Sequence, residues 1–414
     1  MYRVSAFLRH FALALAAGIA VATLWVNLAP ASYYDAIEWR LADLALPLWM
    51  AAFPIALTPV AIVSEGLMAL FLFYIGKELW EAIRLERGAL SGPRGALPAG
   101  AMIGGWIGAI VLWLIVGAAF ETALEATPGV GWPVPVGSDV VLTYVIGRRV
   151  FGSGHPALHL LLLITIANDI AGLVLAGVAY PTSGLRLAWL LVTVLAVVGV
   201  WLGFGRAARP GQTERAHRRA FALWPYAVAG VLSWAGVVLA GLPGALGLIP
   251  LIPAIPHADR AFGMFAEAEE FLHDPLNRLA HLLIVPIGVI LFLFGLTRGG
   301  IDASALAPTT GTVLAALWIG KPLGVILGVL LAGRILGQAQ GWAQGRAQGL
   351  PPGVAMRDLV LIAMISGMGF TVPVLALETA LPGGGMAEAA RLGLALSMLA
   401  GVAALALGRL WPRS

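Results

Sequence analysis

The chain has 414 residues, of which 60% are hydrophobic and only 11% are charged, with a net charge of +4 and no cysteine. Because ordinary soluble domains carry about 25% charged residues, this composition excludes a protein surrounded by water and predicts one embedded in lipid. It also excludes disulfides, thiolate metal sites and cysteine nucleophiles. A small basic excess is typical of cytoplasmic loops and does not indicate nucleic-acid binding.

Apolar runs predict about twelve membrane spans, because a bilayer core needs about 20 apolar residues per helix. In chain order, the predicted spans are Phe11–Leu28, Val60–Gly76, Ala99–Phe120, Val134–Ile146, Leu158–Ala179, Leu187–Phe204, Ala222–Ala240, Leu242–Ile255, Leu276–Leu296, Thr312–Leu331, Leu359–Ala380 and Ala389–Leu407. The fourth and eighth are too short to cross as plain helices. The prediction is therefore an all-α integral membrane protein with one polytopic domain, residues 1–414.

The basic residues of the predicted loops alternate strongly between the two sides of the membrane. An even number of spans places both termini on one side, and the loops of that side contain most of the arginines. The opposite loops contain only Arg40, Arg186, Arg298 and Arg391. Since cytoplasmic loops carry the excess of Lys and Arg, both termini are predicted to be cytoplasmic.

Four ionisable residues within predicted spans are candidates for function, because a charge there costs at least ~2.5 kcal/mol. Asp169 is near the middle of its span, and its alternative role is a structural hydrogen bond. Asp139 follows a run of helix breakers, and its alternative role is that of a helix N-cap. Lys321 lies mid-span, with snorkelling to the interface as the alternative. Glu65 is nearer a span end and fits an interface or a site equally well.

Two of the spans contain helix-breaking segments in corresponding positions. One segment is 133–139, with two prolines and a glycine, and the other is 366–373, with two glycines and a proline. Each falls in the second span of a three-span unit, and the units, residues 97–180 and 312–410, start from opposite sides of the membrane. Paired interrupted helices of this kind indicate inverted-topology repeats with a transport site where the two discontinuous helices cross.

Six short strings of this chain resemble the NhaA family of bacterial sodium/proton antiporters. They are residues 65–71 leading to 76–78, 138–139, 168–169, 273–275, 320–324 and 367–371. The resemblance implies that Asp169 is the family's cation- and proton-binding aspartate and that Lys321 is its essential lysine. It also matches Ser138 and Asp139 to the Thr-Asp pair of the first broken helix.

The chain departs from the family pattern at three places. The first of two adjacent aspartates is Asn168, a histidine of the eighth span is absent from 241–245, and the string ending the second span is 76–78, Gly-Lys-Glu. These departures bear on the proton-to-sodium stoichiometry and on pH regulation. Candidate residues for pH regulation are Glu78 and four residues of the acidic loop 256–275, namely His257, Glu267, Glu270 and His273; a solvated loop is the alternative interpretation.

The resemblance implies a secondary transporter of the bacterial inner membrane that exchanges cytoplasmic Na⁺, or Li⁺, for external H⁺. A carboxylate suits this exchange because Na⁺ and a proton compete for the same oxygens. Asp169 and Asp139 are the expected ligands of transported Na⁺, and Ser138, Asn168 and Lys321 complete the expected site. No cofactor, enzymatic reaction or nucleic-acid partner is expected, and a homodimer is implied. The alternatives are an ion-coupled symporter of a small organic anion and a non-transporting membrane sensor.

Overall fold

The computed structural model describes residues 4–44, 55–85, 90, 95–121, 129–181, 184–208, 220–257, 264–267, 272, 274–339, 353–381 and 383–411. The helices are α1 (Phe7–Leu28), α2 (Pro30–Ile37), α3 (Pro59–Ala61), α4 (Met68–Arg84), α5 (Ala96–Glu121), α6 (Val140–Phe151), α7 (Pro156–Ala179), α8 (Leu190–Gly203), α10 (Trp224–Leu239), α11 (Pro275–Arg298), α12 (Pro308–Ala315), α13 (Lys321–Ala339), α14 (Met356–Ser366), α15 (Thr371–Ala380), α16 (Gly385–Ser397) and α17 (Leu399–Leu410). Single turns of π-helix occupy Ile62–Leu67 and Ala316–Gly320, and 3₁₀ turns occupy Val134–Val136, Leu187–Trp189, Gly205–Ala208, Gly244–Leu246 and Ile249–Ala254.

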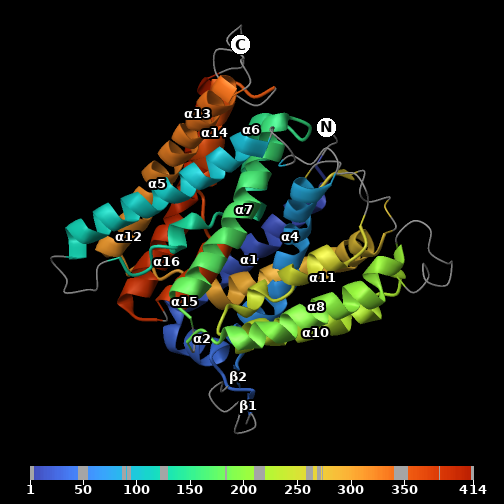
Figure 1. Ribbon diagram of the computed structural model, residues 1–414. Coiled ribbons are helices and arrows are strands. Elements are labelled where there is room, and N and C mark those ends of the chain that lie inside the picture. The colour runs from blue at the N-terminus through green and yellow to red at the C-terminus, as the bar shows by residue number, and fades with distance from the viewer. Residues whose placement is uncertain are drawn as a thin grey trace.

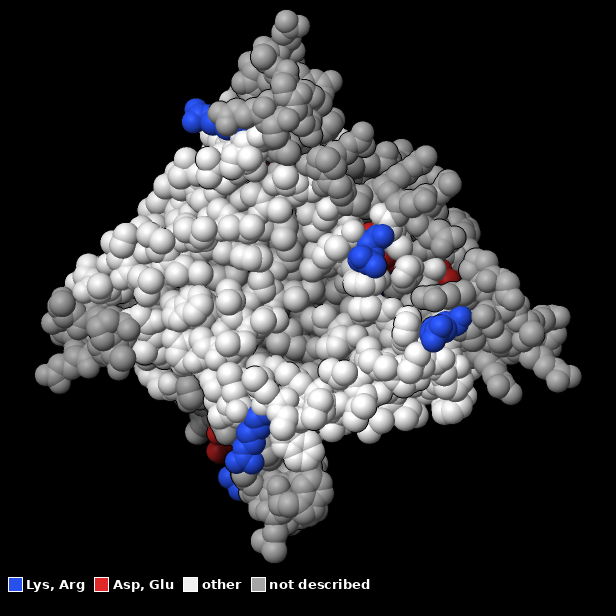
Figure 2. All heavy atoms as spheres, viewed as in Figure 1, with Lys and Arg blue, Asp and Glu red and all other residues white. Residues whose placement is uncertain are grey.

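The described helices form a membrane protein. Seven continuous helical segments are long and apolar enough to cross a bilayer, and the bent pair α14–α15 raises the number to eight. The remaining four of the twelve predicted spans coincide with shorter elements: α6 with its preceding turn, α8, α10 and the 3₁₀ turns of 244–254. The described part of the face shown in Figure 2 is largely uncharged, with charged side chains at only a few places. Lipid would contact such a surface without desolvating charges.

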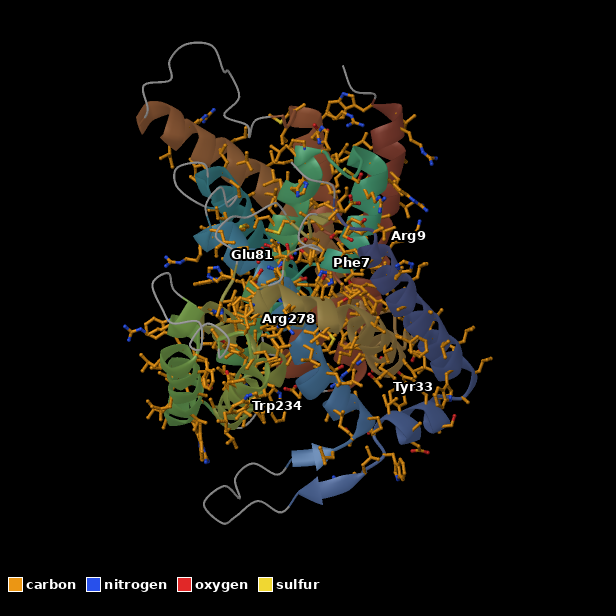
Figure 3. All side chains as sticks on the ribbon, turned by 90° about the vertical axis from the view of Figure 1, so that its right-hand side faces the viewer. Phe7, Arg9, Tyr33, Glu81, Trp234 and Arg278 are labelled. Atoms are coloured by element: carbon orange, nitrogen blue, oxygen red, sulfur yellow. The ribbon has the colours of Figure 1, made fainter. Side chains whose placement is uncertain are left out.

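A short two-stranded ribbon adds to the predicted all-α architecture. Strands β1 (Ala42–Leu44) and β2 (Ile55–Leu57) pair antiparallel, with Ala42 opposite Leu57 and Leu44 opposite Ile55. The ribbon lies at one end of the helical body, on the side of Tyr33, whereas Phe7, Arg9 and Glu81 lie toward the opposite half (Figure 3). A segment of this length between two spans contains too few residues for hydropathy to distinguish a strand from an interfacial stretch.

Helices α5 and α13 pack along one another over most of their lengths (Figure 1). Glycines at intervals of four residues make this contact possible: 100, 104 and 108 on α5 face 320, 324 and 328 around the start of α13. A Cβ on Gly104 would lie 2.2 Å from the carbonyl oxygen of Gly324, so a larger residue could not fit. Small residues at this spacing let helix backbones approach closely in a membrane. The pair fixes the position of Lys321, which is the first residue of α13.

The two interrupted helices meet against α7. One consists of the 3₁₀ turn Val134–Val136 followed by α6, and the other of α14 and α15, which bend by 45° across their break. Both α14 and α15 contact α7, as do α6 and the 3₁₀ turn. The predicted breaks at 133–139 and 366–373 are thus confirmed, and they bring backbone that leaves the α-helical path to the side of α7.

Candidate ion-exchange site

Asp169 lies on α7 beside the first break and is completely buried. Its Oδ1 accepts a hydrogen bond from the backbone N–H of Ser138 at 2.7 Å. Its Oδ2 is buried and accepts no hydrogen bond from the described residues. Gly172, one turn further along α7, allows this approach, because a Cβ there would lie 2.7 Å from the nitrogen of Gly137. The carboxylate therefore has one oxygen held in place and one available to a proton or a cation.

Lys321 is completely buried and reaches the other end of the same break. Its ammonium donates to the carbonyl oxygens of Pro135 at 3.1 Å, Val136 at 2.9 Å and Gly137, and to the hydroxyl oxygen of Ser138 at 2.9 Å. These carbonyls end the 3₁₀ turn, where the backbone dipole leaves partial negative charge. The side chain points into the protein, so the snorkelling alternative does not apply.

Asp139 caps the helices that start from the two breaks. Its Oδ1 accepts from the N–H of Leu142 at 2.8 Å, which makes it the N-cap of α6. Its Oδ2 accepts from the N–H of Thr371, the first residue of α15, at 3.0 Å, and also from the Thr371 hydroxyl. An anion at helix N-termini offsets their positive partial charge. Both carboxylate oxygens are engaged in these contacts, which matches the N-cap alternative and leaves ion ligation by Asp139 as a proposal.

Replacing Asp139 with Asn is therefore expected to weaken ion binding without abolishing exchange. The amide supplies one acceptor oxygen where the carboxylate supplies two, so one helix N-terminus loses its partner. The apparent half-saturating Na⁺ concentration should increase about tenfold, the size of one lost charged hydrogen bond, and the maximal rate should change less. Proton flux in proteoliposomes at graded Na⁺ concentrations measures both quantities. A complete loss of exchange would contradict this expectation.

Ser138 connects Lys321 to Asp169, and Asn168 contacts Ser138. The Asn168 amide nitrogen donates to the Ser138 hydroxyl oxygen at 3.2 Å, and its amide oxygen accepts from the indole N–H of Trp106 at 2.7 Å. The Ser138 hydroxyl donates to the carbonyl oxygen of Ser366 at 3.1 Å. Five of the predicted site residues thus lie together: Asp139, Asp169, Ser138, Asn168 and Lys321.

Glu65 belongs to a different neighbourhood. It lies in the π-helical turn Ile62–Leu67, where its carboxylate accepts from the N–H of Gly244. Its carbonyl oxygen accepts from the indole N–H of Trp234 at 2.6 Å. Glu65 therefore joins the start of the second span to Gly244, within the segment 241–245 from which the expected histidine is absent.

Glu78, one of the pH-regulation candidates, lies in contacts that do not include Asp169. Glu78 is buried on α4, where it pairs with the Lys77 ammonium at 3.1 Å and accepts from the N–H of Phe265 at 2.6 Å. A pocket beside this pair is lined partly by Phe7, Lys77 and Glu78, and not by Asp169. Glu267 is exposed and His257 is half-buried near Trp80. Glu270 and His273 lie outside the described residues.

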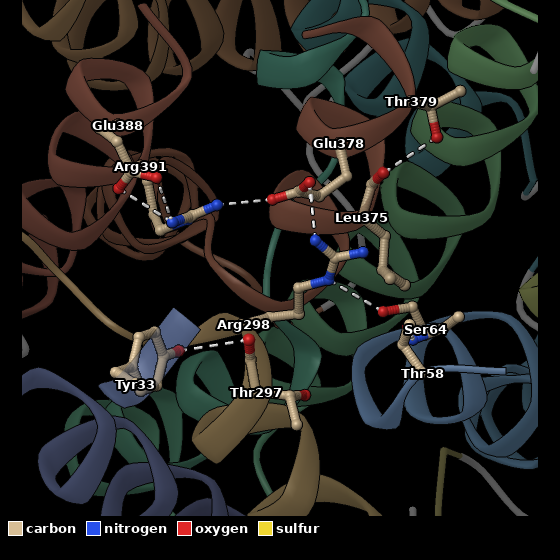
Figure 4. Close-up of polar contacts among 11 residues, drawn as sticks. Tyr33, Thr58, Ser64, Thr297, Arg298, Leu375, Glu378, Thr379, Glu388 and Arg391 are labelled. Carbon is tan, nitrogen blue, oxygen red and sulfur yellow. Dashed lines mark hydrogen bonds and ion pairs between the residues drawn. The ribbon is translucent and has the colours of Figure 1, made fainter. Parts of the chain in front are cut away.

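A chain of ion pairs joins α11, α15 and α16 (Figure 4). The Glu378 carboxylate on α15 pairs with Arg298 of α11 at 2.7 Å and with Arg391 of α16 at 2.6 Å. Arg391 also pairs with Glu388 at 2.8 Å, and Arg298 donates to Ser64 at 3.0 Å. Two of the few arginines on the predicted outer side are therefore matched by carboxylates.

Tyr33 of α2 contacts the end of α11 beside these ion pairs. Its hydroxyl donates to the carbonyl oxygens of Leu296 at 3.1 Å and Thr297 at 3.2 Å. Burial raises the pKa of Tyr33 to about 12, so the hydroxyl keeps its proton and donates throughout the physiological pH range.

Comparison with known proteins shows the family of this chain. The family model described as Na⁺/H⁺ antiporter 1 matches residues 8–408. The chain belongs to this family. The Na(+)/H(+) antiporter NhaA of Jannaschia sp. (strain CCS1) is 39% identical over 434 residues, which cover 99% of this chain and 98% of that protein. The Na(+)/H(+) antiporter NhaA of Geobacter metallireducens is 33% identical over 407 residues, with 97% and 96% covered. The resemblance seen in six short strings is confirmed over nearly the whole chain.

Two contacts of this family member were not predicted from the sequence. Hydropathy does not identify the contact of Trp106, because a tryptophan in an apolar span has the same hydropathy whether or not its N–H donates a hydrogen bond. Thr371 was noted within a string, but its bonds to Asp139 cross 232 positions of the chain, and only the folded structure brings the two together.

Proposed function

We propose that this chain exchanges Na⁺ for H⁺ across the bacterial inner membrane by alternating access, with Asp169 as the group that holds either ion. Membership of the Na⁺/H⁺ antiporter 1 family supports exchange as the activity. The observation that carries the assignment is the Asp169 Oδ2, a buried carboxylate oxygen without a hydrogen-bond donor among the described residues. Exchange needs no cofactor and no chemical reaction of a bound substrate.

The exchange follows because the free oxygen of Asp169 holds either a proton or a sodium ion, but not both at once. Na⁺ is a hard cation that prefers oxygen ligands, and it binds Asp169 only when the proton has left. An ionised Asp169 without a cation would be a buried unpaired charge, which is costly at membrane depth. We therefore propose that the site changes its exposure only when Asp169 holds a proton or a sodium ion, and this coupling makes the transport obligatory exchange.

In this mechanism Lys321 and Asp139 stabilise the ends of the interrupted helices. The ammonium lies at carbonyl oxygens that end a turn, and the carboxylate lies at N–H groups that begin two helices. Opposite charges at opposite helix ends offset the partial charges of interrupted helices. We propose that both groups keep their charges through the cycle, and that Asp139 contributes to cation binding through the position of the break.

The arrangement in the membrane is also a proposal. Residues 97–180 and 312–410 are proposed as inverted repeats, which the meeting of their interrupted spans against α7 supports. Both termini are proposed to be cytoplasmic, because the arginines of the other side are few and two of them are paired with Glu378 and Glu388. A homodimer and a role in pH regulation for Glu78, Glu267 and His257 are proposed from the family resemblance and the acidic loop alone.

An organic-anion symporter is not favoured. The family and the relatives of this chain are named as antiporters of Na⁺ and H⁺. The cation at the centre, Lys321, already donates to four oxygen atoms of the protein, so it has no donor left over for a substrate carboxylate.

Asn168 leads us to propose exchange of one proton for one sodium ion. Where the family pattern has a second aspartate, this chain has an amide that cannot release a proton and whose oxygen and nitrogen are both hydrogen-bonded. Lys321 would be the alternative source of a second proton. Because its ammonium donates to four oxygens, its loss of a proton would leave acceptors without a donor, which argues for a permanent charge.

We therefore predict that the exchange is electroneutral. Exchange of two protons per sodium ion moves one charge, and the membrane potential would drive it by about 2.3 kcal/mol per 100 mV. In proteoliposomes with the same Na⁺ gradient and the potential set at two values by potassium and valinomycin, proton fluxes should be equal. A flux or an end point that follows the imposed potential would show that another group replaces the missing aspartate.

A further inference from the structure

Trp106 of α5 determines which way the Asn168 amide faces. Its indole N–H donates to the Asn168 oxygen at 2.7 Å. An indole nitrogen can donate a hydrogen bond but cannot accept one. The atom of Asn168 opposite Trp106 must therefore be the oxygen, and the amide nitrogen must face the other way, toward Ser138.

This orientation fixes every hydrogen bond of the Ser138 hydroxyl. A hydroxyl has one hydrogen and two lone pairs. The lone pairs of Ser138 accept from the Asn168 amide at 3.2 Å and from the Lys321 ammonium at 2.9 Å. Its hydrogen is donated to Ser366 at 3.1 Å, which links the two interrupted helices. With the amide reversed, Ser138 would face an oxygen, and its hydrogen would be drawn away from Ser366.

The packing of α5 on α13 holds Trp106 in place for this contact. The preceding residue, Gly105, lies against the stem of Lys321, since a Cβ there would be 3.7 Å from the lysine Cγ. The glycines of both helices bring the two backbones into direct contact. The tryptophan that contacts Asn168 and the lysine that contacts Ser138 therefore lie on two helices that pack against one another.

We propose that Trp106 is a positioning residue of the exchange site: by orienting Asn168 it holds the Ser138 hydroxyl, and with it the break whose backbone N–H contacts Asp169, in the geometry that binds the cation. Asp169 is the buried group whose free oxygen selects between Na⁺ and a proton. This inference rests on the proposed exchange activity and adds to it a residue outside the charged cluster.

The first test compares Trp106→Phe with Trp113→Phe in proteoliposomes. Trp113 is a matched control because it lies on the same helix and its indole N–H also donates to an oxygen, that of Val130, at 3.2 Å. Loss of the Trp106 donor should raise the half-saturating Na⁺ concentration about two- to tenfold, the effect of one hydrogen bond, with a smaller change in maximal rate. Trp113→Phe should keep the wild-type value.

The second test asks whether Trp106 acts through Asn168. In an Asn168→Ala background, Trp106→Phe should cause no further increase, because the amide that it orients is absent. An equal increase in both backgrounds, or a wild-type value for Trp106→Phe, would overturn the inference. Wild-type protein without Na⁺-dependent proton flux would instead overturn the proposed function.

A third test uses two other variants and applies also if Trp106→Phe does not fold. Trp106→Gln keeps an N–H donor and Trp106→Met, of similar length, lacks one. The glutamine variant should have the lower half-saturating Na⁺ concentration of the two, and equal values would overturn the role of the donor.

Discussion

Asp169→Asn should reduce Na⁺-dependent proton flux to the level of liposomes without protein, while leaving the protein folded and inserted. Asparagine keeps the size of the side chain and can still accept from Ser138 through its oxygen, so the break retains its contact with α7. It carries no charge and no exchangeable proton, so it cannot alternate between the two ions. Flux with pyranine as internal pH indicator measures the loss, and thermal stability in detergent checks the fold.

Asp302→Asn is the matched control for this variant. The chemical change is the same, but the Asp302 carboxylate accepts its hydrogen bonds, among the described residues, from the neighbouring Ser304. It should exchange ions as the wild type does. Wild-type flux from purified Asp169→Asn protein would remove Asp169 from the mechanism.

Lys321→Ala should damage both stability and exchange. It removes a buried ammonium from three carbonyl oxygens, which lose this donor, and from the Ser138 hydroxyl oxygen, which keeps only the bond from Asn168. Removing one partner from a buried charged group typically costs about 3–5 kcal/mol. We expect a clear decrease in Tm in detergent and loss of Na⁺-dependent proton flux in proteoliposomes.

The control for Lys321→Ala lies on the same helix. Arg334→Ala removes an exposed cation from α13, and neither Tm nor flux should change. An unchanged Tm together with unchanged transport for Lys321→Ala would mean that the ammonium contributes nothing at the break.

The sequence predicts which ionisable residues are functional candidates, because placing a charged side chain within the membrane costs free energy and such residues are rare there. Asp169 and Lys321 are identifiable from their mid-span positions alone, and both are completely buried. The breaks are identifiable because proline and glycine interrupt helices wherever they occur. Their meeting against α7 depends on packing between distant segments, which the pattern of inverted spans indicated but did not fix.

Other features depend on contacts that no local pattern encodes. Asp139 could be read as a ligand or as an N-cap, and the folded chain shows the cap, together with a second helix start at Thr371. The orientation of the Asn168 side-chain amide depends on Trp106, which is 62 positions away in the chain. The β1–β2 ribbon is too short to have a period that hydropathy can detect, and the separation of Glu65 from Asp169 depends on where the 3₁₀ turns of 244–254 pack.

Competition between Na⁺ and protons for Asp169 is the central claim, and equilibrium binding of radioactive Na⁺ to the purified protein tests it most directly. Measured over a series of pH values, the half-saturating Na⁺ concentration should decrease as pH rises and then level off, while the amount of Na⁺ bound at saturation stays constant. Asp169→Asn should bind no Na⁺ at any pH in the series. A half-saturating concentration independent of pH in the wild type, or saturable binding by Asp169→Asn, would contradict the account.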